Sequence, residues 1–193
     1  MLDRSLYKNL SISYKDQSLN IIQPLISCQQ SHALFDSWVS NIFNFEKCLT
    51  IPSDYSSESI DIFVNYINNK VIPDEIDEKI RFELLNLSLF TITPELITKC
   101  ITSMSELVRV FNELISKEES VDFLESSIAK YILCGDFEGI CNFDFLVIFR
   151  SFSEAIRISL PSKSDSDSLR ISPSRIISFI SHLISHSKFD LSL

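Results

Sequence analysis

The chain has 193 residues, a formal net charge of −9 and a sequence pI of about 4.8, and 45% of its residues are hydrophobic. A chain of this length forms one large domain or two small ones and folds without needing disulfides or metal. The acidic balance argues against nucleic-acid binding, because phosphates repel such a chain. Its two glycines are too few for barrels, sandwiches or glycine-rich phosphate loops.

Cysteine usage and hydropathy indicate a cytoplasmic protein, with a nuclear location left open. The five cysteines are an odd number, widely spaced and mostly in apolar runs, which is typical of reduced core cysteines. The N-terminus lacks the apolar stretch of a signal peptide. The apolar run at 145–149 is far shorter than the roughly 20 residues of a membrane span. We therefore expect a soluble protein without a membrane partner.

The first fifty residues predict a small sheet and one helix. Residues 10–14 and 19–23 have strand patterns on either side of a polar break at 15–18, which predicts a hairpin. Residues 48–52 predict a third short strand ended by proline. Between the hairpin and this strand, apolar residues fall near helical spacing: Leu25, Cys28, Phe35, Trp38, Val39 and Ile42.

Three helices and one edge strand are predicted for 59–104. The first helix presents one apolar face, made by Ile60, Phe63, Val64 and Ile67. It ends at 68–70 and gives way to a two-residue edge strand at 71–72. A second helix begins near Asp74 or Asp77 and carries apolar residues at Ile80, Leu84, Leu85, Leu87 and Phe90. Thr93 and Pro94 open a third helix, predicted for 95–104.

Only helices are predicted after Ser103, which begins a capping box. The first carries Leu107, Val110, Phe111, Leu114 and Ile115, and the others cover 121–133, 142–158 and 175–186. The serine- and aspartate-rich stretch at 159–172 is a predicted loop with serines spaced for acidophilic kinases, which raises regulation by phosphorylation. The chain ends in apolar residues without a polar tail, so we expect a truncated or short gene product.

Two constellations suggest enzyme chemistry, and neither is favoured. A zinc-dependent enzyme would draw on two cysteines and a histidine pair: Cys134, Cys141, His182 and His186. The two cysteines are spaced more widely than is usual for zinc, and both histidines are expected on the polar side of their helix. A thiol enzyme would draw on Cys28 and His32, but no nucleophile turn accompanies them. We expect no enzyme, no metal and no cofactor.

Residues 51–100 resemble the second half of a BTB (POZ) domain, a family with a helix of the form "aF..ll.yiY.g" and then a helix pair reading "ll.lA..l.i.eL...C". The matching positions are Ile60, Phe63, Val64, Tyr66, Ile67, Leu84, Leu85, Leu87, Phe90, Leu96 and Cys100. Asn69 and Lys70 take the place of the family's turn. The hairpin and the following helix resemble the opening of the domain, so the resemblance covers 6–104. Residues 105–193 resemble the BACK-like helical region that often follows.

The resemblance implies an α+β, predominantly helical fold, in which a small sheet of short strands braces a helical cluster and an all-α bundle follows. Domains of this family bind proteins, dimerise, and many link cullin-type ubiquitin ligases to their substrates through the paired helices after the strands. It therefore implies a non-enzymatic adaptor or dimerisation module. Four aromatic side chains are candidate contacts, with core packing as the alternative for each: Phe45, Tyr55, Tyr66 and Phe90. The alternative function is a structural or vestigial domain without a ligase link.

Overall fold

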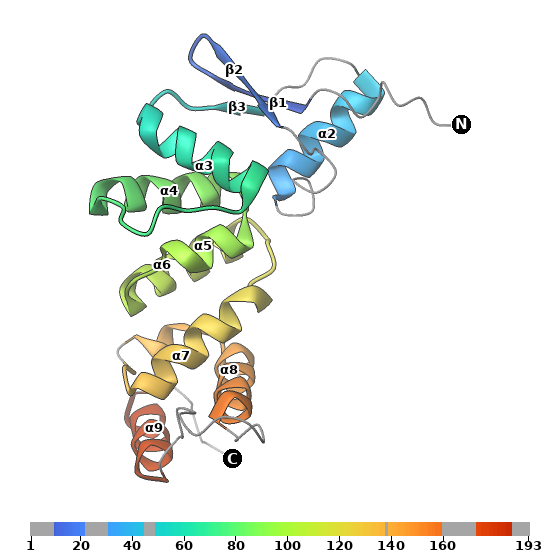
Figure 1. Ribbon diagram of the computed structural model, residues 1–193. Coiled ribbons are helices and arrows are strands. Elements are labelled where there is room, and N and C mark those ends of the chain that lie inside the picture. The colour runs from blue at the N-terminus through green and yellow to red at the C-terminus, as the bar shows by residue number, and fades with distance from the viewer. Residues whose placement is uncertain (1–9, 22–30, 45–48, 138, 160–172, 187–193) are drawn as a thin grey trace. The chain divides into compact units, whose positions relative to one another are not determined.

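The computed structural model describes residues 10–21, 31–44, 49–137, 139–159 and 173–186 (Figure 1). The chain divides into two compact units, Met1–Cys100 and Ile101–Leu193, whereas the sequence places the boundary at 104. The described residues are predominantly helical, with a three-stranded sheet in the first unit, and this confirms the predicted fold class at that level. Each unit is described by itself.

The sheet of the first unit has the order β2-β1-β3. β1 (Leu10–Tyr14) and β2 (Gln17–Ile21) form the predicted antiparallel hairpin, and β3 (Leu49–Ile51) pairs parallel to β1. The turn is shorter than predicted, because Gln17 pairs with Tyr14 and only two residues remain between the strands. Lys15 takes the left-handed conformation in this turn, with φ 52°. One face of the sheet belongs to the core, since its buried residues are Ile12, Tyr14, Ile21 and Ile51.

Four helices complete the described part of the first unit: α2 (His32–Asn44), α3 (Ser57–Asn69), α4 (Glu78–Thr91) and α5 (Pro94–Cys100). Figure 1 shows α3 between the sheet and α4, and α4 packs against both α3 and α5. α2 packs on α4 through backbone groups as well. The N–H of His32 donates to the carbonyl of Ile92 at 3.1 Å, and the Ser31 hydroxyl donates to the carbonyl of Thr91 at 2.6 Å.

Helix α3 ends as the sequence predicts, but the edge strand expected after it is absent. Lys70 is the C-cap, with φ 61°, and its N–H donates to the carbonyl of Tyr66 at 2.8 Å. Residues 71–72 form no strand, and Val71 is 53% exposed. The carbonyl of Val71 accepts from the Asn65 side chain at 3.4 Å instead of from a strand. Two residues before a proline offer too few backbone hydrogen bonds to hold a strand at a sheet edge.

Two other predictions for the first unit are wrong in detail. On α2, Leu34 is fully buried and Phe35 is 48% exposed, so the core-facing side is shifted by one residue from the predicted one. The third helix of the 59–104 stretch ends at Cys100 rather than continuing to 104. The Arg81 guanidinium donates to the Cys100 carbonyl at 2.6 Å and so satisfies a backbone group at that helix end.

The second unit contains α6 (Met104–Ser116), α7 (Glu125–Cys134), α8 (Phe145–Ser159) and α9 (Pro173–His186). Short 3-10 turns, η2 (Asp122–Leu124) and η3 (Ile140–Asn142), precede α7 and α8. Ser103 caps α6, because its hydroxyl accepts from the N–H of Glu106 at 3.2 Å, and the Glu106 carboxylate accepts from the N–H of Thr102, the residue before the cap, at 2.9 Å. Among the described helices of this unit, α7 and α8 pack against each other most extensively.

Aromatic contacts join the parts of the second unit. The rings of Phe152 and Phe179 stack at 4.9 Å between α8 and α9, and Phe111 meets Phe143 edge-on at 4.9 Å. Because Phe179 is buried, Ile180 lies 45% exposed, although the sequence places it on the apolar face. Ile115 is likewise 47% exposed. Residues 160–172 and 187–193, on which the phosphorylation and truncation predictions fall, lie outside the described residues.

The end of α6 yields a stability prediction, because the exposed residue Glu118 is held in the left-handed region with φ 58°. A side chain with a Cβ is disfavoured there and glycine is not. We expect Glu118→Gly to raise the free energy of unfolding by about 1 kcal/mol, measured by urea denaturation.

Two variants control for charge and for chain entropy in this experiment. Glu118→Gln removes the carboxylate but keeps the Cβ, so it should raise the free energy of unfolding much less than Glu118→Gly does. Glu119→Gly, at a position without positive φ, should lower the free energy of unfolding by about 0.5–1 kcal/mol. Equal effects of glycine at the two positions would contradict this account of Glu118.

Candidate interaction surface

The α4 surface, defined by Phe82, Asn86 and Phe90, is the clearest candidate for a contact site in the first unit. These three residues follow one another at four-residue steps, so they lie on one side of the helix. Phe82 is 45% exposed and Phe90 is 40% exposed. Covering the rest of each ring would contribute about 1 kcal/mol, which is a driving force for association.

The opposite side of α4 explains why this surface faces outward. Its side chains fill the core of the first unit, and the buried aliphatic ones are Ile80, Leu84, Leu85 and Leu87, while Leu89, seven residues after Phe82 and on the same side of the helix, is buried as well. The helix starts at Asp77, whose carboxylate accepts from the N–H of Lys79 at 2.8 Å. It stops at Ile92, a left-handed residue with φ 49°. With the core satisfied by five aliphatic side chains, the two phenylalanines remain on the outer side.

A hydrogen-bonded junction fixes α4 against the start of α3. The Glu83 carboxylate on α4 accepts from the Ser56 N–H at 2.9 Å and from the Ser56 hydroxyl at 2.5 Å. Ser56 also caps α3, since its hydroxyl oxygen accepts from the N–H of Ser59 at 3.2 Å. These hydrogen bonds from Ser56 lower the pKa of Glu83 and keep it ionised beside the helix N-terminus. The junction restrains the helix that bears Phe82 and Phe90.

The four aromatic residues predicted as contacts occupy different environments. Phe90 is on the α4 surface. Tyr55 is half-buried, and its carbonyl accepts a hydrogen bond from the Tyr14 hydroxyl. Tyr66 is fully buried, so its side chain is a core residue. Phe45 lies outside the described residues.

The sequence prediction missed Phe82, although a signal for it was present. Phe82 and Phe90 are eight residues apart on one helix, on the side opposite the leucines at 84, 85 and 87. Phe35 was also missed as an exposed residue. It lies one turn into α2, near the junction of His32 with Ile92 at the end of α4.

Tyr66 lies under a charged cluster that ties α3 to α5. The Lys70 ammonium is 2.5 Å from one Glu95 carboxylate oxygen and 3.3 Å from the Tyr66 hydroxyl oxygen. The Lys99 ammonium is 3.4 Å from the other Glu95 oxygen. Both ammonium groups lie over the Tyr66 ring, at 4.8 and 5.2 Å from its centroid. Tyr66 thus has a structural role that its position in the sequence pattern does not reveal.

This cluster shifts two pKa values in opposite directions. The hydrogen bond from Lys70 is the main cause that lowers the pKa of Glu95 to about 2, and Tyr66 and Lys99 add to it. Burial is the main cause that raises the pKa of Tyr66, and its hydrogen bond to Glu95 adds to it. At neutral pH the cluster therefore holds an ionised carboxylate and a protonated phenol.

The alternative enzyme sites gain no support from the described residues. Cys134 is exposed, and burial raises the pKa of the Cys141 thiol, which disfavours the thiolate that zinc binding or nucleophilic attack requires. The His182 ring lies 5.9 Å from that of Phe137, so His182 is half-buried rather than on the polar side as predicted. In the part of the chain that the structure describes, no three histidine, cysteine or acidic residues group as metal ligands.

Parts of these sites fall beyond what the structure covers. Cys28 lies outside the described residues, and His186 is described only as the last residue of α9. His32 begins α2, and its side chain is exposed.

Comparison with known proteins leaves the family of the chain unassigned. No protein-family model matches the sequence, and no curated protein matches it. Among the described helices, none is long and apolar enough to cross a bilayer. The α4 surface and its exposed phenylalanines are thus the main structural guide to function.

The Glu95 cluster yields a pH prediction. A carboxylate whose pKa is lowered on folding stabilises the protein above its ordinary pKa, and this stabilisation is lost as pH falls towards the folded value. Because Glu95 is half-exposed, we expect Glu95→Gln to lower the free energy of unfolding by no more than about 1 kcal/mol at neutral pH. The difference should shrink to a small fraction of this value by about pH 2.

Chemical denaturation of the parent chain and the variant at both pH values measures this effect. Glu75→Gln, which removes an exposed carboxylate between α3 and α4, is the matched control and should change little at either pH. The same loss for Glu95→Gln at both pH values would show that packing, rather than charge, is responsible.

Proposed function

We propose that this chain is a non-enzymatic protein–protein interaction module of the BTB type with a BACK-like helical region, acting through the α4 surface. The observation that carries the proposal is the exposure of Phe82 and Phe90 on one side of a helix whose other side is core. Exposed aromatic side chains on a restrained helix are typical of protein contact sites.

The order of elements in the first unit supports this proposal. In its described residues, a hairpin, a helix, a short third strand and then three helices occur in this order, which is the arrangement that the sequence resemblance implies. The missing strand at 71–72 is a departure from that arrangement. Phe90 lies on α4, the first helix of the pair α4 and α5, and in the family this pair follows the strands and contacts partners.

Two kinds of partner follow from the same surface, a second copy of the chain and a cullin-type ligase subunit. Self-association is tested first because it needs only the purified chain. The acidic net charge opposes close approach of two copies, so the apolar α4 surface must supply the attraction. An adaptor would bring the same surface, or the adjoining α5, to the cullin.

Sedimentation equilibrium over a concentration series tests the self-association. We expect the parent chain to form dimers. In the double variant Phe82→Ser/Phe90→Ser, the dissociation constant of the dimer should rise on the order of tenfold or more. Phe149→Ser is the matched control, because Phe149 is 58% exposed on α8 in the other unit. This control should leave the dimer unchanged.

Titration of the chain with purified cullin tests the adaptor role independently. Binding that the same double variant weakens, and that Phe149→Ser does not, supports an adaptor even if the chain is monomeric. A chain that neither self-associates nor binds cullin would overturn the proposal and leave the structural domain as the alternative. If Phe149→Ser weakened binding as much as the double variant does, the contact would not be specific to the α4 surface, and this would contradict the proposal.

A further inference from the structure

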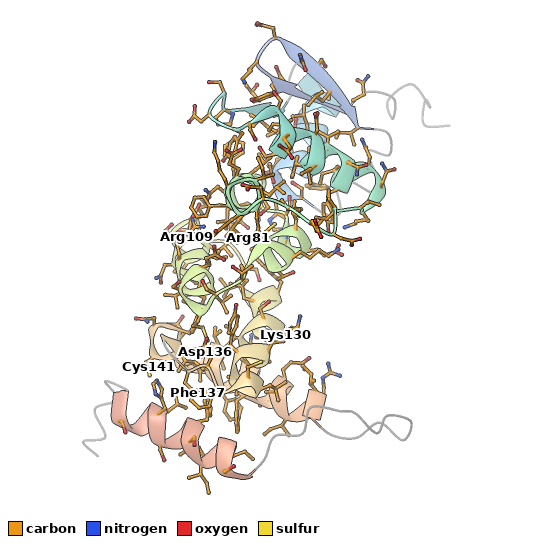
Figure 2. The ribbon with its side chains drawn as sticks, turned by 60° about the vertical axis from the view of Figure 1, so that its left-hand side comes forward. Arg81, Arg109, Lys130, Asp136, Phe137 and Cys141 are labelled. Atoms are coloured by element: carbon orange, nitrogen blue, oxygen red, sulfur yellow. The ribbon has the colours of Figure 1, made fainter. Side chains whose placement is uncertain are left out.

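A cleft of about 480 Å³ lies in the second unit, between the start of α6 and the connection from α7 to α8. This volume is within the roughly 300–1,000 Å³ of typical ligand-binding cavities. Met104, which is buried, and Val108 give it an apolar lining from α6. Asp136 and Asn142 line it from the connection, and Figure 2 shows Asp136 next to Phe137 at the end of α7.

Gly139 keeps this cleft open. With φ +78°, it adopts a conformation that other residues rarely take. A Cβ placed there would lie 3.4 Å from both the Val108 side chain and the Asn142 amide nitrogen, and these two residues line the cleft. The other glycine, Gly135, has φ +82°, but a Cβ there would meet no atom within 4 Å. Any side chain at 139, unlike one at 135, would therefore reduce the space in the cleft.

The charge of the cleft favours a cationic ligand. Asp136 is the carboxylate among the described lining residues, and none of these is basic. Burial is the main cause that raises the pKa of the neighbouring Tyr131, and the charges of Asp136 and Glu106 add to it, which shows negative potential on this side of the unit. Asp136 also follows closely on the C-terminal end of α7, where the helix dipole is negative.

The alternative ligand is an anion bound at the N-terminal end of α6. Ser103 and Ser105 line the cleft there, and their hydroxyls are 3.0 Å apart. However, Glu106 lies in the first turn of α6, and its carboxylate accepts from the N–H of Thr102 at 2.9 Å. Together with Asp136, it opposes a second negative charge. The serine hydroxyls can accept hydrogen bonds from a cation as well as donate them.

We propose that this cleft binds a lysine or arginine side chain of a protein partner. The aliphatic stem would pack on Met104 and Val108, and the cationic head would reach the Asp136 carboxylate. The Asn142 amide nitrogen donates to the Gly139 carbonyl at 2.9 Å, so the amide oxygen is the acceptor that Asn142 offers the ligand. Every group in this site belongs to the second unit, so the site is independent of the α4 surface.

NMR titration of the 193-residue chain, labelled with nitrogen-15, tests this site. The probe is the peptide acetyl-Gly-Lys-Gly-amide, compared with matched peptides that carry norleucine or glutamate in place of lysine. We expect saturable shifts of the backbone signals of Met104, Ser105, Val108 and Gly139 with the lysine peptide alone. Equal shifts with norleucine, stronger shifts with glutamate, or no shifts at these residues would each overturn the proposal.

Three variants sharpen the test. Asp136→Asn should weaken lysine binding by about two- to fivefold, the effect of one exposed charge pair. Gly139→Ala should weaken it because its methyl group enters the cleft, whereas Gly135→Ala imposes the same backbone strain in open space and should leave the affinity unchanged. If Gly139→Ala fails to fold, Asp136→Asn decides alone, because unchanged affinity in that variant would contradict the assigned role of the carboxylate.

Discussion

The first unit depends on the burial of one side of α4. Its aliphatic residues form the centre of the core, and α2, α3 and α5 each attach to this helix. Ser56 at the start of α3 donates to Glu83, and Ser31 and His32 at the start of α2 donate to the end of α4. Because these attachments are hydrogen bonds at fixed positions, they set the rotation of α4 as well as its place.

The end of α4 shows the cost of this arrangement. Ile92 is β-branched and adopts the left-handed conformation, which costs about 1–2 kcal/mol relative to the usual region. The conformation persists because the Thr93 N–H donates to the Ser88 carbonyl at 2.8 Å and the Ile92 carbonyl accepts from α2. The Thr91 and Thr93 hydroxyls, 2.8 Å apart, complete this buried turn. These hydrogen bonds offset the strain and hold the chain in the turn that joins α4 to α5.

Much of the fold was predictable because local rules decide it. The hairpin follows from period-two alternation at 10–14, and the end of α3 lies at 68–70 as predicted, although Lys70 rather than an asparagine adopts the left-handed conformation. The caps at Asp77 and Ser103 follow from their side-chain acceptors. None of these features needs knowledge of distant contacts, so sequence patterns were sufficient.

The sequence predictions were wrong where contacts between residues distant in sequence determine the orientation of a helix or side chain. Leu34 rather than Phe35 faces the core, because backbone hydrogen bonds to the end of α4 set the rotation of α2. Tyr66 looked like a contact residue, yet Lys70, Glu95 and Lys99 from a later turn and helix cover it. The cleft beside Gly139 depends on α6 and the α7–α8 connection coming together, which no local pattern reports.

The central claim is that the α4 surface contacts another protein, and photo-crosslinking tests it most directly. A benzophenone amino acid is placed singly at 82, 90 or 149 in the purified chain. Irradiation of the chain alone, or of the chain mixed with cullin, then reports which position touches a partner. We expect covalent dimers or cullin adducts from 82 and 90, and background levels from 149. Equal yields from all three positions, or none from 82 and 90, would contradict it.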